Sequence, residues 1–252
     1  KSFYDLFLID INMPEMDGVK VFEEIKEISG LSSVIMMTAG APESMIKNAI
    51  EKGAFAVLYK LHGLKKITNM VDEAMESPRI LVIDDSAKDR EALKNMLVEK
   101  KYKVAVADSK EAALKNLSQN EIDVVFIDIV MPNEDGFAIL KEIKNAYPNI
   151  GSVMMTSYTD IEYTEIALEK GAYTCLYKPL DVSTIMGIVE KLQQKRTQMQ
   201  GGVQSVLLVE DDDAVGESLS AILRHELYSV QCVPTGAEAI NENKKTIYSS
   251  AI

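Results

Sequence analysis

The stretch that decides the fold lies at residues 124–136 and is VVFIDIVMPNEDG. Its first four residues are apolar and mostly β-branched, which is typical of a strand buried on both faces. The run ends in an aspartate, Asp128, and a helical pattern begins at Gly136. We therefore expect a buried strand that presents a carboxylate at its carboxyl end and then leads into a helix.

Similar strand and helix patterns alternate on both sides of this stretch. Apolar residues at helical spacing predict a helix after each strand, and the last helix is capped by Asp181 and extends to about residue 198. Five alternations predict a parallel sheet covered by helices on both faces, with any site at the carboxyl ends of the strands. The expected strands are at residues 79–83, 104–107, 123–128, 153–156 and 173–177.

The sequence contains an internal repeat, which we describe with three names. Residues 79–200 form a complete unit, the middle unit. Residues 1–76, the head, match its back half when 118 is added to their numbers, and residues 203–252, the tail, match its front half at an offset of 126. The matched residues include Asp10 with Asp128, Thr38 with Thr156, Lys60 with Lys178, and Glu210–Asp211 with Asp84–Asp85.

Head and tail together contain one whole unit, split between the two ends of the chain. We expect them to associate through the sheet, because a lone head would expose unpaired backbone. A circular permutation would achieve this within one chain, and a domain swap would achieve it in a homodimer. Truncation of a larger protein with three units is a third origin. Gly201–Gly202 is expected to break the last helix as a hinge.

Composition excludes several classes of protein. The formal net charge of -12 argues against a surface that binds the phosphate backbone of nucleic acids, so no nucleic-acid partner is expected. No apolar run reaches the roughly 18 residues of a membrane helix, and the first residues do not resemble a signal peptide, so we expect a cytoplasmic protein without membrane contact. Cys175 and Cys232 form no CxxC motif and lie in apolar runs, which predicts two reduced core cysteines.

Polar residues of complementary chemistry stand at the predicted strand ends of the middle unit. Crowded carboxylates repel one another unless a cation joins them, and an all-oxygen site suits Mg²⁺. An aspartate held there can act as a nucleophile toward a phosphoryl group, while an ammonium and a hydroxyl contact the phosphoryl oxygens. The residues concerned are Asp84, Asp85, Asp128, Thr156 and Lys178.

Four motifs of the middle unit resemble the response-regulator receiver family of two-component signalling. They are ILVIDD at 80–85, VVFIDIVMPNEDG at 124–136, VMMTS at 153–157 and LYKP at 176–179. The resemblance implies an α/β fold, a doubly wound, flavodoxin-like (βα)5 domain with a parallel five-stranded sheet in the order 2-1-3-4-5. The head and tail would form a second domain of this kind.

The resemblance also implies a role for each site residue of the middle unit. Asp128 would be the phosphoacceptor. Around Mg²⁺, Asp85 would be a direct ligand, Asp84 would hold metal-bound water, and Val130 would contribute its backbone carbonyl. Thr156 and Lys178 would contact phosphoryl oxygens. The remaining implied roles are an aromatic reporter that turns inward, Tyr177, and a cis peptide bond that places the lysine, at Pro179.

In the split copy the same roles fall on matching residues. The resemblance implies a second phosphoacceptor, Asp10, with a metal site and a set of switch residues around it. The metal contacts would be Asp10, Glu210, Asp211 and the carbonyl of Asn12, and the phosphoryl-binding and switch residues would be Thr38, Lys60 and Tyr59. Leu61 replaces the proline that follows the lysine, and a trans bond there could shift Lys60.

The resemblance predicts a signalling protein that phosphorylates itself from a sensor histidine kinase or a histidine phosphotransfer protein and later loses the phosphate. It is not expected to be a turnover enzyme or a histidine kinase, since no nucleotide-binding glycine loop is present. A downstream effector domain or protein would receive the signal. The alternative is a docking module in which one or both domains no longer switch.

Overall fold

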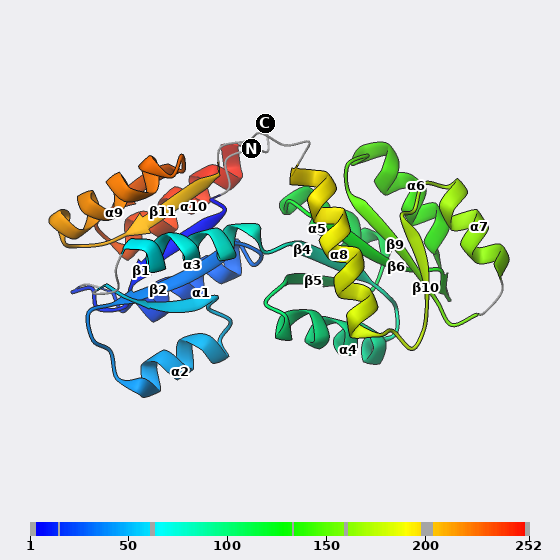
Figure 1. Cartoon of the computed structure of the whole chain (residues 1–252), viewed down its shortest axis with the longest axis horizontal. Coiled ribbons are helices and arrows are strands. Elements are labelled where there is room, and N and C mark those ends of the chain that lie inside the picture. The colour runs from blue at the N-terminus through cyan, green and yellow to red at the C-terminus, as the bar shows by residue number, and fades with distance from the viewer. Residues whose placement is uncertain are drawn as a thin grey trace. The chain divides into compact units, whose positions relative to one another are not determined.

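The computed structural model describes residues 4–14, 16–60, 64–132, 134–158, 161–197 and 204–249. The chain forms two compact units. One is the middle unit, residues 78–201. The other combines residues 1–77 with residues 202–252 and is called the split unit (Figure 1).

The middle unit alternates strands and helices around one parallel sheet. Its strands lie in the order β10-β9-β6-β4-β5, which is 2-1-3-4-5 read from the other edge, so the expected fold and strand order are confirmed. The elements are β4 (Arg79–Ile83), α4 (Ala87–Glu99), β5 (Lys103–Ala107), α5 (Lys110–Gln119), β6 (Val124–Asp128), α6 (Gly136–Ala146), β9 (Gly151–Thr156), α7 (Ile161–Glu169), β10 (Thr174–Tyr177) and α8 (Val182–Thr197).

Burial explains why the central strands are apolar throughout. All five residues of β6 are buried, and so are the last four of β4, because helices cover both faces of the sheet. Polar residues begin the helices: Ser86 accepts a hydrogen bond at the start of α4, and Asp135 does so at the start of α6. The sequence analysis did not predict a short antiparallel ribbon, β7 (Val130–Met131) with β8 (Glu134–Asp135).

The split unit has the same sheet order, β12-β11-β1-β2-β3, with strands from both ends of the chain. The blue head and the orange and red tail meet in one unit in Figure 1. The head forms β1 (Leu6–Asp10), α1 (Gly18–Ile28), β2 (Ser33–Thr38), α2 (Glu43–Glu51), β3 (Ala56–Tyr59) and α3 (Leu64–Glu76), and the tail forms β11 (Ser205–Val209), α9 (Asp213–His225), β12 (Ser229–Val233) and α10 (Gly236–Ser249).

Head and tail share the core of the split unit. Strand β11 runs parallel to β1, with Leu6 opposite Val206 and Ile9 opposite Val209. On each face of the sheet, one apolar cluster contains buried residues of both halves. Asp5 also accepts hydrogen bonds from the backbone and the hydroxyl of Ser205, at 2.9 and 3.1 Å. The tail therefore supplies a central strand, with the head on one side of it.

Some expectations about single residues differ from the structure or lie outside it. Cys175 is buried, but the prediction of a core position for Cys232 is wrong, because this residue is exposed on the edge strand β12. Gly201–Gly202 and Leu61 lie outside the described residues. Among the residues that the structure describes, none of the helices has the length and apolar character to cross a membrane.

Two glycines of the middle unit should respond oppositely to the same substitution. A Cβ at Gly136 would lie 2.1 Å from the carbonyl oxygen of Asp128, whereas a Cβ at Gly187 in α8 meets nothing within 4 Å. Gly136→Ala should therefore destabilise the middle unit by about 2 kcal/mol or more. Gly187→Ala should stabilise it by about 0.5–1 kcal/mol. Urea unfolding measures both, and a stable Gly136→Ala variant would contradict the close approach.

Candidate functional site

The parallel strands of the middle unit bring three carboxylates together at one edge of the sheet. Asp128 ends β6, and Asp84 and Asp85 follow β4, the neighbouring strand. One carboxylate oxygen from each lies within 4.8 Å of the others. Asp84 and Asp128 are buried and Asp85 is exposed, so the cluster opens to solvent on one side.

Lys178, directly after β10, reaches into this cluster. Its Nζ lies 2.7 Å from Oδ2 of Asp84 and 2.8 Å from Oδ2 of Asp128. Burial raises the pKa of Asp84, the charge of Asp128 adds to this effect, and Lys178 opposes it. Burial lowers the pKa of Lys178, but its bonds to both carboxylates outweigh burial, and the pKa lies above its ordinary value.

Backbone amides hold the two buried carboxylates in place. Oδ1 of Asp84 accepts a hydrogen bond from the backbone N–H of Ser86 at 2.8 Å, and Oδ1 of Asp128 accepts one from Val130 at 3.3 Å. The sequence analysis missed one further contact, in which Arg90 of α4 donates from Nη1 to the carbonyl oxygen of Asp84 at 2.6 Å. The sequence signal for this contact is an arginine in the first turns of the helix that follows the acidic pair.

Thr156 and Tyr177 occupy different environments. Thr156 ends β9 and is fully buried, and its hydroxyl accepts a hydrogen bond from the backbone N–H of Tyr158 at 3.0 Å. Tyr177 is 40% exposed, and its hydroxyl lies 2.9 Å from that of Thr164 in α7. The aromatic ring therefore lies at the surface in this conformation. The peptide bond between Lys178 and Pro179 is cis.

The split unit repeats this arrangement with residues from both halves. Asp10 from the head and Glu210 and Asp211 from the tail each place a carboxylate oxygen within 4.8 Å of the others. Nζ of Lys60, from the head, lies 2.8 Å from Oδ2 of Asp10 and 2.7 Å from Oε2 of Glu210. Burial raises the pKa of Glu210, which Lys60 opposes. The site is complete only where head and tail meet.

The neighbourhood of Asp10 differs from that of Asp128 in two respects. Asn12 donates from Nδ2 to the hydroxyl of buried Thr38 at 3.4 Å, a contact that Val130 cannot make. Lys60 reaches its carboxylates although leucine replaces the following proline. Tyr59, like its counterpart, is 39% exposed.

Both clusters have the composition of a site for a hard divalent cation. Each offers only oxygen ligands, and each sets three carboxylates against one lysine, which leaves a negative excess in a partly buried place. Mg²⁺ accepts such ligands together with water and phosphate oxygens. The residues present therefore fit this ion.

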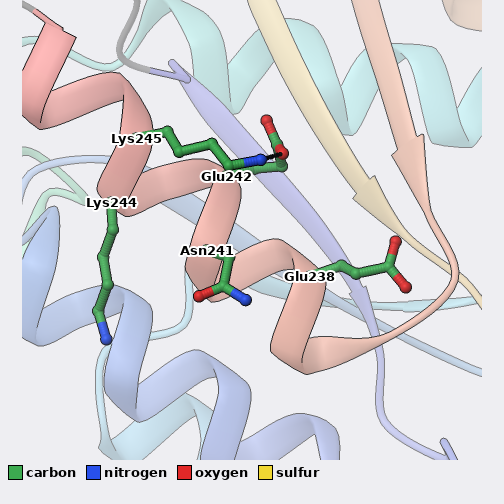
Figure 2. A pocket seen from close by; sticks show the side chains of 5 residues that line it. All are labelled: Glu238, Asn241, Glu242, Lys244 and Lys245. Atoms are coloured by element: carbon green, nitrogen blue, oxygen red, sulfur yellow. Dashed lines mark hydrogen bonds and ion pairs between the residues drawn. The ribbon is translucent and has the colours of Figure 1, made fainter.

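A hollow on the surface of the split unit lies elsewhere and contains none of the cluster residues. It has a volume of about 500 Å³ and lies along α10, as Figure 2 shows. Polar residues of this one helix line it, and Lys245 is paired there with Glu242. The lining residues are Glu238, Asn241, Glu242, Lys244 and Lys245. The clusters are therefore open strand-end sites and not parts of this hollow.

Comparison with known proteins agrees with this geometry. Residues 1–72 and 80–190 match the response regulator receiver domain. The chain belongs to this family. Receiver domains interact with histidine kinases in two-component systems, and they generally bind Mg²⁺.

Individual relatives match only parts of the chain. The DNA-binding transcriptional regulator NtrC of Proteus hauseri is 28% identical over 145 residues, 57% of this chain and 31% of that protein. The transcriptional regulatory protein ZraR of Escherichia coli K12 is 38% identical over 112 residues, 44% of this chain and 25% of that protein. The matched segments therefore span less than a third of either regulator.

Among solved structures, a receiver domain protein of Clostridium thermocellum is 28% identical, with a TM-score of 0.47. The alignment covers 49% of this chain and 99% of that protein.

The raised pKa of Asp84 predicts how the stability of the metal-free middle unit depends on pH. A carboxyl whose pKa is raised by folding contributes stability below its ordinary pKa of 3.8, and this contribution is lost as the pH rises through the folded value. Asp84→Asn should therefore raise the stability of the metal-free middle unit at pH 7 by about 0.5–1 kcal/mol. Its stability should also vary less between pH 4 and neutrality.

Urea midpoints in excess chelator, measured across this pH range, check the result. Glu99→Gln, which neutralises an exposed acid in α4, is the matched control and should leave the midpoint unchanged. A loss of stability at pH 7 in Asp84→Asn would mean that the bond to Lys178 outweighs burial and repulsion.

Proposed function

We propose that the middle unit is a magnesium-dependent phosphoacceptor in a two-component phosphorelay, and that Asp128 is its nucleophile. The observation that supports this most directly is the buried carboxylate of Asp128, which lies 2.8 Å from the ammonium of Lys178 and beside the acidic pair. Asp84, Asp85 and Asp128, with the carbonyl of Val130, would hold Mg²⁺. When bound, the ion neutralises charge on the transferred phosphoryl group.

The chain's own residues would perform the transfer as follows. A carboxylate oxygen of Asp128 attacks the phosphorus of a phosphohistidine, an O–P bond forms, the N–P bond breaks, and the imidazole leaves and takes a proton from water. Lys178 already lies between two carboxylates, so a small movement brings its ammonium to a phosphoryl oxygen. The hydroxyl of Thr156 would turn from the Tyr158 amide to another phosphoryl oxygen.

We propose the same reaction for the split unit, with Asp10 as nucleophile. Head and tail would form one receiver within a single chain, as a circular permutation. Parallel pairing of β1 with β11 supports this, and so does an acidic cluster that needs Asp10 from the head and Glu210–Asp211 from the tail. Thr38, Lys60 and the carbonyl of Asn12 would serve as their counterparts do in the middle unit.

Phosphorylation would act on partners through a change of conformation. We propose that a sensor histidine kinase or a histidine phosphotransfer protein supplies the phosphate, and that an effector domain or protein responds. The two regulators compared above are named for transcription and extend well beyond the matched segments, which supports an effector of this kind. The negative charge of the chain makes direct nucleic-acid binding by the receivers unfavourable.

Labelling with a small phosphodonor tests the two sites separately. With magnesium and acetyl phosphate, the wild-type chain should gain two phosphates, and Asp128→Asn and Asp10→Asn should each gain one, because each removes one nucleophile. The double variant should gain none. Intact-mass spectrometry and peptide mapping give the count and the site, and excess chelator should abolish both additions.

Asp108→Asn, which alters an exposed acid between β5 and α5, is the matched control and should label like wild type. Labelling of residues 79–200 in Asp128→Asn would refute the assignment of that nucleophile. A failure of wild type to label with any phosphodonor would instead favour a docking module.

The proposed switch predicts a change that extends beyond the site. With beryllofluoride, a phosphoryl mimic, amide signals of Thr156 and Tyr177 should shift together with those of α7, because the Tyr177 hydroxyl contacts Thr164 in that helix. Thr156→Ala should remove the distant shifts and keep those beside Asp128. Shifts confined to the neighbours of Asp128 in wild type would exclude this coupling.

A further inference from the structure

Helix α10 of the tail packs closely against α1 of the head. The two backbones approach one another along several turns. The counterpart helices of the middle unit, α5 and α6, are both fully described and show no comparable approach. The split unit therefore has a contact between its halves that the middle unit does not repeat.

Gly236, the first residue of α10, makes this close approach possible. A Cβ at this position would lie 2.2 Å from Cγ2 of Val21 and 3.3 Å from Sδ of Met16. Val21 is fully buried and β-branched, so it has little freedom to rotate away. The counterpart of Gly236 in the middle unit is Lys110, which shows that the fold itself accepts a side chain there.

A buried hydrogen bond lies farther along the same contact. Oδ1 of Asn243 in α10 accepts from the hydroxyl of Ser29, the residue that ends α1, at 3.0 Å. Asn243 is fully buried and Ser29 is 5% exposed. Among the described residues, Nδ2 of Asn243 has no acceptor, so Ser29 provides the hydrogen bond that this amide makes. The counterparts are Leu117 and Tyr147, which cannot form this pair.

A third pair crosses the contact between head and tail at the sheet. The hydroxyl of Tyr4 donates to Oε1 of Gln231 in β12. The counterparts in the middle unit are Ile122 and Ala105, two apolar residues. Val21 has Ile139 as its counterpart. At three places, therefore, a tail residue that differs from the middle unit meets a head residue that also differs.

We propose that the α1–α10 contact is a recognition surface through which the tail selects the head as the half that completes its sheet. The inference rests on the proposed union of head and tail in one receiver. The chain contains two back halves of the same fold, and β11 and β4 present similar apolar sequences, VLLV and ILVI. The sheet alone therefore discriminates little between the two possible partners.

The helix contact supplies the missing discrimination. Against the back half of the middle unit, Asn243 would face Tyr147 instead of the Ser29 hydroxyl, and Gly236 would face Ile139, which is one methylene larger than Val21. A buried amide without its partner and an overfilled contact both disfavour the wrong pairing. Specificity thus comes from penalties at the wrong partner as much as from contacts at the right one.

Two substitutions in the full chain test the proposal. Gly236→Lys and Asn243→Leu each introduce the residue that the middle unit has at the same place in its helix, and both favour helix formation. If α10 contributed only helix stability and no recognition of the head, both variants would exchange like wild type. We expect instead that hydrogen exchange in α1 and α10 becomes at least about tenfold faster in each variant, with α6 of the middle unit unchanged.

Two controls accompany these variants. Lys244→Leu replaces an exposed residue beside the hollow of Figure 2 and should exchange like wild type. Ser29→Ala with Asn243→Leu removes both members of the buried pair, and should exchange more slowly than Asn243→Leu alone because no hydroxyl is left without its partner.

Amine cross-linking identifies the partner directly. In wild type, Lys244 should be linked to Lys20 or Lys26 of α1, and these links should become weaker in Gly236→Lys and Asn243→Leu. Wild-type exchange rates in α1 for both variants would overturn the proposal, as would links from wild-type Lys244 chiefly to Lys141 or Lys144 of α6. Neither measurement depends on phosphate, so absent labelling of Asp10 would count only against the proposed phosphotransfer.

Discussion

The structure of each unit depends on holding three carboxylates beside one ammonium at the carboxyl edge of a parallel sheet. The constraint explains why the acids follow adjacent central strands, and why the lysine follows the last strand in sequence and reaches across the strand between. It also explains the burial of Asp84 and Glu210, since charges attract a ligand more strongly where water is partly excluded. The cost is mutual repulsion, which the bound cation would relieve.

The two units show which parts of this arrangement are fixed and which vary. Glu210 replaces an aspartate, and its longer side chain still reaches its lysine. Nearby, Gly216 leaves room for Cys232, whose Sγ would lie 3.0 Å from a Cβ at that position. The middle unit has Arg90 at that place, which binds the backbone beside Asp84. Lys60 keeps its position without the proline that follows Lys178. The charges are therefore retained while their supports differ.

The sequence was sufficient to predict the sheet and the cluster of carboxylates. An apolar run that ends in aspartate indicates both a buried strand and a carboxylate at its carboxyl end. The repeat extended this reasoning to Asp10 and Lys60. It was insufficient where packing decides: Cys232 lies on an edge strand and is exposed. The contact of Gly236 with Val21 depends on how two helices approach, which strand and helix periodicity does not determine.

The position of β11 inside its sheet has a consequence for how the chain is made. Asp5 and its partner Ser205 are 200 residues apart in the chain. At about 5–20 residues per second, the head leaves the ribosome about 10–40 s before the strand that it must pair with. During this interval the middle unit, whose contacts are local in comparison, completes its own sheet. The sheet of the split unit is therefore completed only after the unit that lies between its two halves in the chain has been synthesised.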